Sequence, residues 1–204
     1  MIGYYNYTVY LTYLGLVSAV VGISLALGGM PMGAVVCLMI SGVCDLFDGK
    51  IARTKKDRTD EEKSFGIQID SLCDLVCFGV LPAVLGMTIG ASAWWQIAIE
   101  ALFVLCGVIR LGYYNVSEII RQKETSANRS SYKGLPITMS AMFVPLLFAF
   151  RNQLGGALPL AYSLLLLFLA VCYIAPISIK KPGKVGTVIM IAVGLAILAL
   201  IIFL

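Results

Sequence analysis

The chain has 204 residues, of which 60% are hydrophobic and only 13% are charged, and its mean hydropathy is +0.94. This composition excludes a soluble domain, so the sequence predicts one polytopic membrane domain over residues 1–204. The net charge of +4 is small, and we expect no nucleic-acid partner. The absence of histidine, and of any CxxC pair among the six cysteines, argues against a zinc site and against acid/base catalysis by histidine.

Apolar runs long enough to cross a membrane recur along the whole chain. A membrane-spanning helix needs about 20 mostly apolar residues. The fold class that we expect is therefore all-α, a bundle of six to seven transmembrane helices. The predicted spans are about 5–28, 31–53, 66–88, 92–115, 134–151, 157–178 and 185–204, and the fifth is the shortest.

Basic residues are distributed unevenly between the connections. Apart from Arg151, every lysine and arginine lies in or beside the connection between the second and third, the fourth and fifth, or the sixth and seventh spans. With seven spans, these three connections lie on one side of the membrane, which the positive-inside rule makes cytoplasmic. The sequence thus predicts an integral cell-membrane protein with its N-terminus inside and its C-terminus outside.

Two carboxylates stand at the predicted cytoplasmic end of the second span. Asp45, Asp48, Gly49 and Ala52 have offsets of 0, 3, 4 and 7, so they share one face of a helix. The two small residues leave room for a ligand to lie flat against the backbone. Arg53 adjoins this face and is a candidate to hold a phosphate.

The third span carries a second acidic face at its predicted cytoplasmic end. Gly66, Asp70 and Asp74 follow one another at intervals of four residues. A helical hairpin would turn this face toward that of the second span, so that four carboxylates converge. Oxygen ligands without nitrogen or sulfur suit Mg²⁺, Mn²⁺ or Ca²⁺. Two such ions, about 3.5–4 Å apart, could clamp a phosphoryl group between its attacking and leaving oxygens.

Carboxylates inside a membrane also serve in transporters, so a divalent-cation transporter is the alternative from another class. Such a pathway would need polar groups that continue across the bilayer. Glu100 is the one acidic residue in the predicted outer half. For Glu100 itself, we expect structural pairing or a dimer contact rather than catalysis.

The pattern D(x)2DG(x)2AR, followed by G(x)3D(x)3D, resembles the signature of the CDP-alcohol phosphatidyltransferase family. The connection between its two halves, residues 54–65, is longer than the usual spacer. The resemblance implies that Asp74 is the general base as well as a metal ligand. It further implies metal ligands at Asp45, Asp48, Asp70 and Asp74, and a CDP-binding site made of Asp45, Asp48, Gly49, Ala52, Arg53 and Gly66.

Three further segments are similar to those of family members that use serine as the acceptor. They are DSLCDLVCFGVLPA at 70–83, RLGYYNV at 110–116 and YKGLPIT at 132–138. This resemblance implies transfer of a phosphatidyl group from CDP-diacylglycerol, or an archaeal CDP-diether lipid, to the hydroxyl of L-serine, with release of CMP. Glycerol 3-phosphate, inositol phosphate and choline remain alternative acceptors.

Residues near the cytoplasmic ends of the later spans are candidates for binding the other substrate groups. Arg110 and Lys133 could bind the serine carboxylate or the lipid phosphate, and Asn115 is a weaker candidate for the serine amine. The resemblance also implies two Mg²⁺ or Mn²⁺ ions as cofactors, with Ca²⁺ able to occupy the site without supporting turnover. Finally, it implies an active site that faces the cytoplasm, contact with membrane lipid, and a homodimer.

Overall fold

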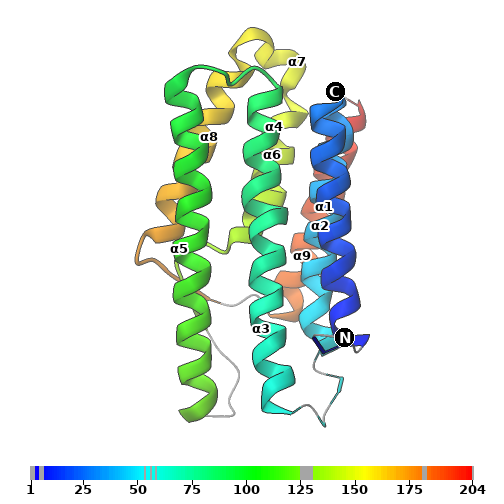
Figure 1. The fold of residues 1–204 in the computed structure, drawn as a ribbon. Helices are drawn as coiled ribbons and strands as arrows, with labels where there is room; N and C mark the ends of the chain where they lie inside the picture. The colour runs from blue at the N-terminus through cyan, green and yellow to red at the C-terminus, as the bar shows by residue number, and fades with distance from the viewer. Residues whose placement is uncertain are drawn as a thin grey trace.

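The protein is an elongated bundle of roughly parallel and antiparallel helices, seen along its side in Figure 1. This computed structural model describes residues 3–4, 7–52, 54–55, 57, 59–124, 131–180 and 183–203. The N-terminus lies at one end of the bundle and the C-terminus at the other, as an odd number of crossings requires. The expected all-α membrane fold is confirmed.

The first half of the chain forms two long helices, a third rod made of three pieces, and the longest helix. After a short 3₁₀ turn, η1, the order is α1, α2, α3, a π-helical segment η2, α4 and α5. Their bounds are η1 Tyr7–Val9, α1 Tyr10–Leu27, α2 Pro31–Ala52, α3 Asp60–Asp74, η2 Leu75–Val80, α4 Leu81–Thr88 and α5 Trp94–Glu124.

The second half adds shorter helices and a small antiparallel strand pair. The strands β1 and β2 join two of the basic connections through three residue pairs, Ser131 with Lys180, Tyr132 with Ile179, and Lys133 with Ser178. The bounds are β1 Ser131–Lys133, η3 Ile137–Met139, α6 Ser140–Ala149, α7 Arg151–Leu154, η4 Gly155–Ala157, α8 Leu158–Ile174, β2 Ser178–Lys180 and α9 Lys184–Phe203.

Among the described residues, six helices are long and apolar enough to cross a membrane. The fifth predicted span, 134–151, forms a shorter apolar helix over Ile137–Ala149. Its start is delayed because Gly134 adopts a left-handed φ of 77° and Pro136 has an extended backbone with φ −56° and ψ 137°. The remaining predicted spans agree with helices to within a few residues, with two exceptions in the connections.

Both exceptions are helices longer than predicted. The connection 54–65 is not all loop, because α3 begins at Asp60. Thr59 caps this helix in a capping box, in which its hydroxyl accepts from the amide of Glu62 and the Glu62 carboxylate accepts from the amide of Thr59. The fourth span likewise runs past 115 as far as Glu124, into a stretch whose polarity suggested a loop.

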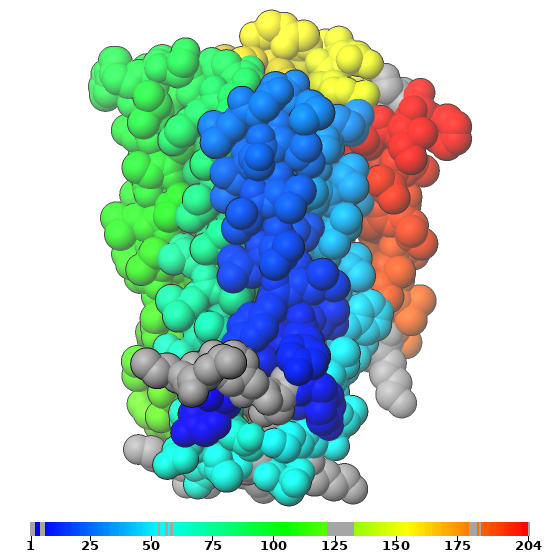
Figure 2. All heavy atoms as spheres, turned by 45° about the vertical axis from the view of Figure 1, so that its right-hand side comes forward, coloured from blue at the N-terminus to red at the C-terminus, as the bar shows by residue number. Residues whose placement is uncertain are grey.

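Packing between the helices is most extensive for α1 with α2 and for α5 with α8. Figure 2 shows α1 on one face of the bundle, with α2 and then α9 beyond it on one side. The helix α9 packs chiefly on α6 and is the most peripheral of the long helices that are described. Arg151 donates to the carbonyl of Ile201 and thereby ties the end of α9 to the α6–α7 corner.

Glu100 lies inside the bundle, and the expected dimer contact is therefore wrong. Its side chain is 0% exposed, and neither carboxylate oxygen has a hydrogen-bond partner among the described residues. Gly86 and Tyr162 lie close to it. A Cβ at residue 86 would come within 2.9 Å of the side chains of both Glu100 and Tyr162. The expected structural pairing is also absent from the described part of the chain.

A buried polar group without a partner lowers stability by about 1–3 kcal/mol. Replacing Glu100 by methionine, which is unbranched and apolar, is therefore expected to raise the midpoint of thermal unfolding by a few degrees. Thermal unfolding of the detergent-solubilised variant measures the effect, with Leu105→Met on the exposed face of the same helix as the control. A lower midpoint for Glu100→Met alone would show that this carboxylate has a stabilising partner.

Candidate active site

Three carboxylates from two helices meet at the end of the bundle that holds the N-terminus. One oxygen from each of Asp45, Asp70 and Asp74 lies within 4.8 Å of the other two. Asp45 comes from the last two turns of α2, whereas the other two lie one turn apart near the end of α3. The structure thus brings together three of the four aspartates that the sequence predicts as metal ligands.

This donor set fits divalent cations such as Mg²⁺ and Mn²⁺, which prefer carboxylate oxygens. Carboxylates packed this closely repel one another unless positive charge offsets theirs. Arg110, which is 9% exposed on α5, lies close enough for its charge to act on Asp45 and Asp74. One guanidinium cannot balance three carboxylates, so bound metal ions would complete the charge balance.

The fourth aspartate, Asp48, accepts a hydrogen bond from the first helix. Thr12 of α1 donates its hydroxyl hydrogen to Oδ2 of Asp48 over 2.9 Å. Both side chains are nearly buried, with exposures of 9% and 8%. Asp48 also lines the same cavity as Asp70, which is a member of the three-carboxylate cluster.

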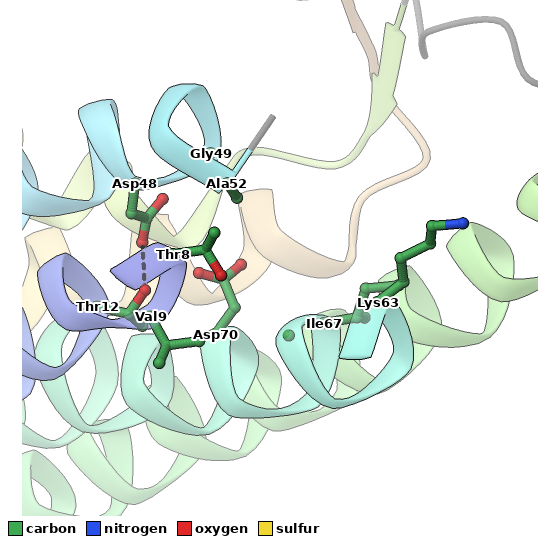
Figure 3. Close-up of a pocket in the computed structure, with 10 residues that line it drawn as sticks. Thr8, Val9, Thr12, Asp48, Gly49, Ala52, Lys63, Ile67 and Asp70 are labelled. Carbon is green, nitrogen blue, oxygen red and sulfur yellow. Dashed lines mark hydrogen bonds between the residues drawn. The ribbon is translucent and has the colours of Figure 1, made fainter. Parts of the chain in front are cut away.

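A cavity of about 180 Å³ opens beside these carboxylates. A side chain at Gly49 would meet no atom within 4 Å of its Cβ, so the glycine leaves one wall of the cavity open. Figure 3 shows the side chains of Asp48 and Asp70 directed into this space and the amine of Lys63 turned away from it. We call this space the polar cavity. The residues that line it are Thr8, Val9, Thr12, Asp48, Gly49, Ala52, Lys63, Gly66, Ile67 and Asp70.

Four of the six residues predicted to bind CDP therefore line one cavity, namely Asp48, Gly49, Ala52 and Gly66. Asp45 lies in the neighbouring three-carboxylate cluster. Arg53, the predicted phosphate contact, falls outside the described residues.

A second, larger cavity of about 380 Å³ lies between α2, α6 and α9. We call this cavity the apolar groove, because the residues that line it are almost entirely hydrophobic. It includes Met39, Val43 and Phe47 of α2, Met142 of α6 and Leu195 of α9, with Asp45 as its acidic member. Asp45 therefore belongs both to the apolar groove and to the carboxylate cluster.

The three candidates for binding the remaining substrate groups lie in different surroundings. Arg110 is buried beside the carboxylate cluster, as described above. Asn115 instead links α5 to the back of α3, because it accepts from Ser71 over 2.7 Å and donates to Gln68 over 3.3 Å. Lys133 is exposed in β1. The structure places only Arg110 next to the carboxylates.

Sequence reasoning missed Lys63, a cavity residue that a longer third helix would have suggested. Lys63 precedes Gly66 by three residues and Asp70 by seven, so all three share a face once α3 begins at Asp60. The capping signature at Thr59 was the available signal. Thr12 had no such signal, because a lone threonine in an apolar helix is ordinary and only packing of α1 on α2 brings it to Asp48.

Comparison with known proteins agrees with this geometry. Residues 5–173 match the sequence model of the family described as CDP-alcohol phosphatidyltransferase. The chain belongs to the CDP-alcohol phosphatidyltransferase family. The match extends from the N-terminal turn to the end of α8, and so takes in every element that lines the polar cavity.

Several curated proteins of this kind are similar to the chain. The CDP-diacylglycerol–serine O-phosphatidyltransferase of Saccharomyces cerevisiae is 35% identical over 119 residues, covering 57% of this chain and 42% of its own length. The protein of the same name from Helicobacter pylori is 32% identical over 118 residues, with coverages of 57% and 46%. The archaetidylserine synthase of Methanothermobacter thermautotrophicus is 30% identical over 154 residues, with coverages of 74% and 62%.

The match spans about half the length of these curated CDP-alcohol phosphatidyltransferases. The family assignment rests on the longer match to residues 5–173. The acceptor named for the relatives is a property of those proteins, and its transfer to this chain is a proposal.

Proposed function

We propose that the chain is a phosphatidylserine synthase that transfers the phosphatidyl group of a CDP-lipid to the hydroxyl of L-serine and releases CMP. The observation that carries this proposal is that the carboxylate cluster shares one member with each of two cavities of opposite character. A CDP-lipid needs a polar site for its nucleotide and an apolar site for its chains. The polar cavity, which Asp70 lines, and the apolar groove, which Asp45 lines, offer these two environments.

The nucleotide end would enter the polar cavity. Gly49 and Ala52 carry almost no side chain there, so the cytidine ring could lie against the backbone of α2. Arg53 follows directly in the sequence and is proposed to contact a phosphate. The lipid chains would then extend into the apolar groove, whose hydrophobic lining favours them through the burial of apolar surface.

The reaction centre would lie at Asp45, Asp48, Asp70 and Asp74. Two divalent cations held there would polarise the diphosphate and offset the charge on the departing CMP. Asp74 is proposed to accept the proton of the serine hydroxyl. The serine oxygen then forms a bond to the lipid-linked phosphorus, and the bond from that phosphorus to the CMP oxygen breaks.

The acceptor assignment rests on the relatives and on one buried charge. The names of the relatives specify serine as the acceptor of those enzymes. Arg110, buried beside Asp45 and Asp74, would supply the cation that a serine carboxylate or lipid phosphate requires. Asn115 and Lys133 remain weaker candidates, because Asn115 is engaged between α3 and α5 and Lys133 is exposed.

The alternative of a divalent-cation transporter has little support from the packing. Between the carboxylate cluster and Glu100, the core contains Phe78, Leu81, Leu85 and Phe103, each at most 1% exposed. These four side chains offer an ion no oxygen ligand. We therefore retain the transferase proposal, with the carboxylates facing the cytoplasm according to the positive-inside rule. The homodimer remains a prediction.

The proposed function predicts that CMP release requires both serine and a divalent metal. Purified protein would be incubated with a CDP-lipid and, in separate arms, L-serine, glycerol 3-phosphate, inositol phosphate or choline. Each arm would contain Mg²⁺, Mn²⁺, Ca²⁺ or a chelator, and ester- and ether-linked CDP-lipids would be compared. Release with serine and Mg²⁺ or Mn²⁺, and loss of release with chelator or Ca²⁺, is the expected result.

A different acceptor dependence would reject the serine assignment. CMP release that depends on glycerol 3-phosphate and ignores serine would place the chain in another branch of the family. Release at an equal rate with and without any acceptor would indicate hydrolysis of the CDP-lipid. Release that persists in chelator would contradict the metal requirement.

A further inference from the structure

The first helix contributes a polar side chain to the acidic site. This side chain lies outside the acidic signature of α2 and α3. Thr12 lies on α1, and its hydroxyl donates to Oδ2 of Asp48 over 2.9 Å, as the dashed line in Figure 3 shows. Both residues line the polar cavity. The hydroxyl therefore binds a carboxylate of the site that lies 36 residues further along the chain, on another helix.

The packing of α1 on α2 gives this hydrogen bond a rigid frame. Close to Thr12, Ser41 of α2 donates to the carbonyl of Gly15 over 2.9 Å. A Cβ at Gly15 would lie 3.3 Å from the Cβ of Cys44, so the two helices approach closely at this point. A β-branched threonine in a helix also has few accessible χ1 rotamers. The position of the hydroxyl relative to Asp48 is thus well determined.

The hydrogen bond distinguishes the two oxygens of Asp48. Oδ2 is occupied by the threonine hydroxyl, so the orientation of the carboxylate about its last torsion is restricted. Oδ1 takes no part in this hydrogen bond, so its direction is fixed together with that of Oδ2. Asp48 is not one of the three aspartates whose oxygens lie within 4.8 Å of one another, so its contribution to a metal site depends on this orientation.

We propose that Thr12 is a positioning residue that orients Asp48 for binding a divalent cation. Partners of this kind, which orient a metal ligand without touching the metal, typically account for 10- to 100-fold in metal affinity. The proposal depends on the proposed function only in assigning the metal to phosphatidyl transfer. Binding of the metal by itself can be measured without CDP-lipid or serine.

The test compares Thr12→Val, which keeps the shape and removes the hydroxyl, with Thr12→Ser, which keeps the hydroxyl. Mn²⁺ is titrated into the purified full chain, and the free ion is followed by electron paramagnetic resonance. We expect the dissociation constant for Mn²⁺ to rise by about 10- to 100-fold in Thr12→Val and to stay within about threefold in Thr12→Ser. Thr88→Val, at the exposed end of α4, controls for the loss of a threonine hydroxyl that donates a hydrogen bond elsewhere.

Equal Mn²⁺ affinity in wild type and Thr12→Val overturns the proposal, as does an equal loss in the valine and serine variants. Should Thr12→Val not fold, Thr12→Cys replaces it, because a thiol is a much weaker hydrogen-bond donor than a hydroxyl and cysteine is unbranched like serine. The cysteine variant must then bind Mn²⁺ more weakly than the serine variant. Absence of Mn²⁺ binding by the wild type also overturns the proposal.

Turnover separates this proposal from the proposed function. If wild-type protein binds Mn²⁺ but releases no CMP with any acceptor, the proposed function fails while the role of Thr12 can still be measured. If wild-type protein turns over, the CMP-release rate of Thr12→Val should recover at high Mn²⁺ concentration. A loss of turnover that excess Mn²⁺ does not relieve contradicts a role in metal binding.

Discussion

Replacing Asp74 by asparagine is expected to reduce CMP release by at least about 100-fold, and by as much as 10⁴-fold, because a positioned general base contributes that much to a reaction rate. Asparagine has nearly the same shape but cannot accept the serine proton. It is also a weaker ligand for a divalent cation than a carboxylate. Single-turnover measurement of CMP release at saturating CDP-lipid and serine would report this loss.

Binding of the CDP-lipid should survive the same substitution in part, because Asp74 does not line the polar cavity. Equilibrium binding of the CDP-lipid to the variant therefore separates a defect in proton transfer from a collapsed site. The matched control is Asp57→Asn, the same chemical change at an exposed aspartate in the connection between α2 and α3. Turnover of the Asp74 variant at the wild-type rate would exclude the proposed base.

Substituting leucine for Gly49 is expected to weaken CDP-lipid binding strongly while leaving the fold intact. A Cβ at this position meets no atom within 4 Å, so the backbone accommodates the side chain, but the side chain then occupies the polar cavity. Overpacking by a group of this size costs about 1–3 kcal/mol. That cost corresponds to a loss of roughly 5- to 160-fold in kcat/KM for the CDP-lipid.

The loss should appear mainly in KM, and the melting temperature should not fall, because leucine is a better helix former than glycine. The control is Gly112→Leu on α5, where a Cβ also meets no atom within 4 Å and the residue is exposed outside both cavities. Equal kinetic effects at the two positions would indicate that bulk at a glycine, rather than filling of the polar cavity, is responsible.

The sequence predicted the general architecture because the membrane imposes simple requirements. Runs of about 20 apolar residues have to form helices to satisfy their backbone hydrogen bonds, and six such helices are present among the described residues. Helical periodicity then placed Asp70 and Asp74 on one face of α3, and the structure brings Asp45 to them.

The errors at helix boundaries have a common cause. Polar residues around Asp60 and after position 115 were interpreted as loops because the predicted helix ends followed hydrophobicity. A capping box starts α3 at Asp60, and α5 continues as far as Glu124. Local hydrogen bonding and helix propensity hold such segments in a helix even where they leave the apolar layer.

By itself, the sequence determined the membrane fold, the acidic signature and the family, since each depends on composition or on spacing along one helix. Only the tertiary structure decided which carboxylates meet. It places Asp48 on Thr12, buries Glu100 without a partner among the described residues, and opens the apolar groove beside Asp45. These features depend on contacts between helices far apart in the chain, and the rotation of one helix against another is set by close packing of side chains.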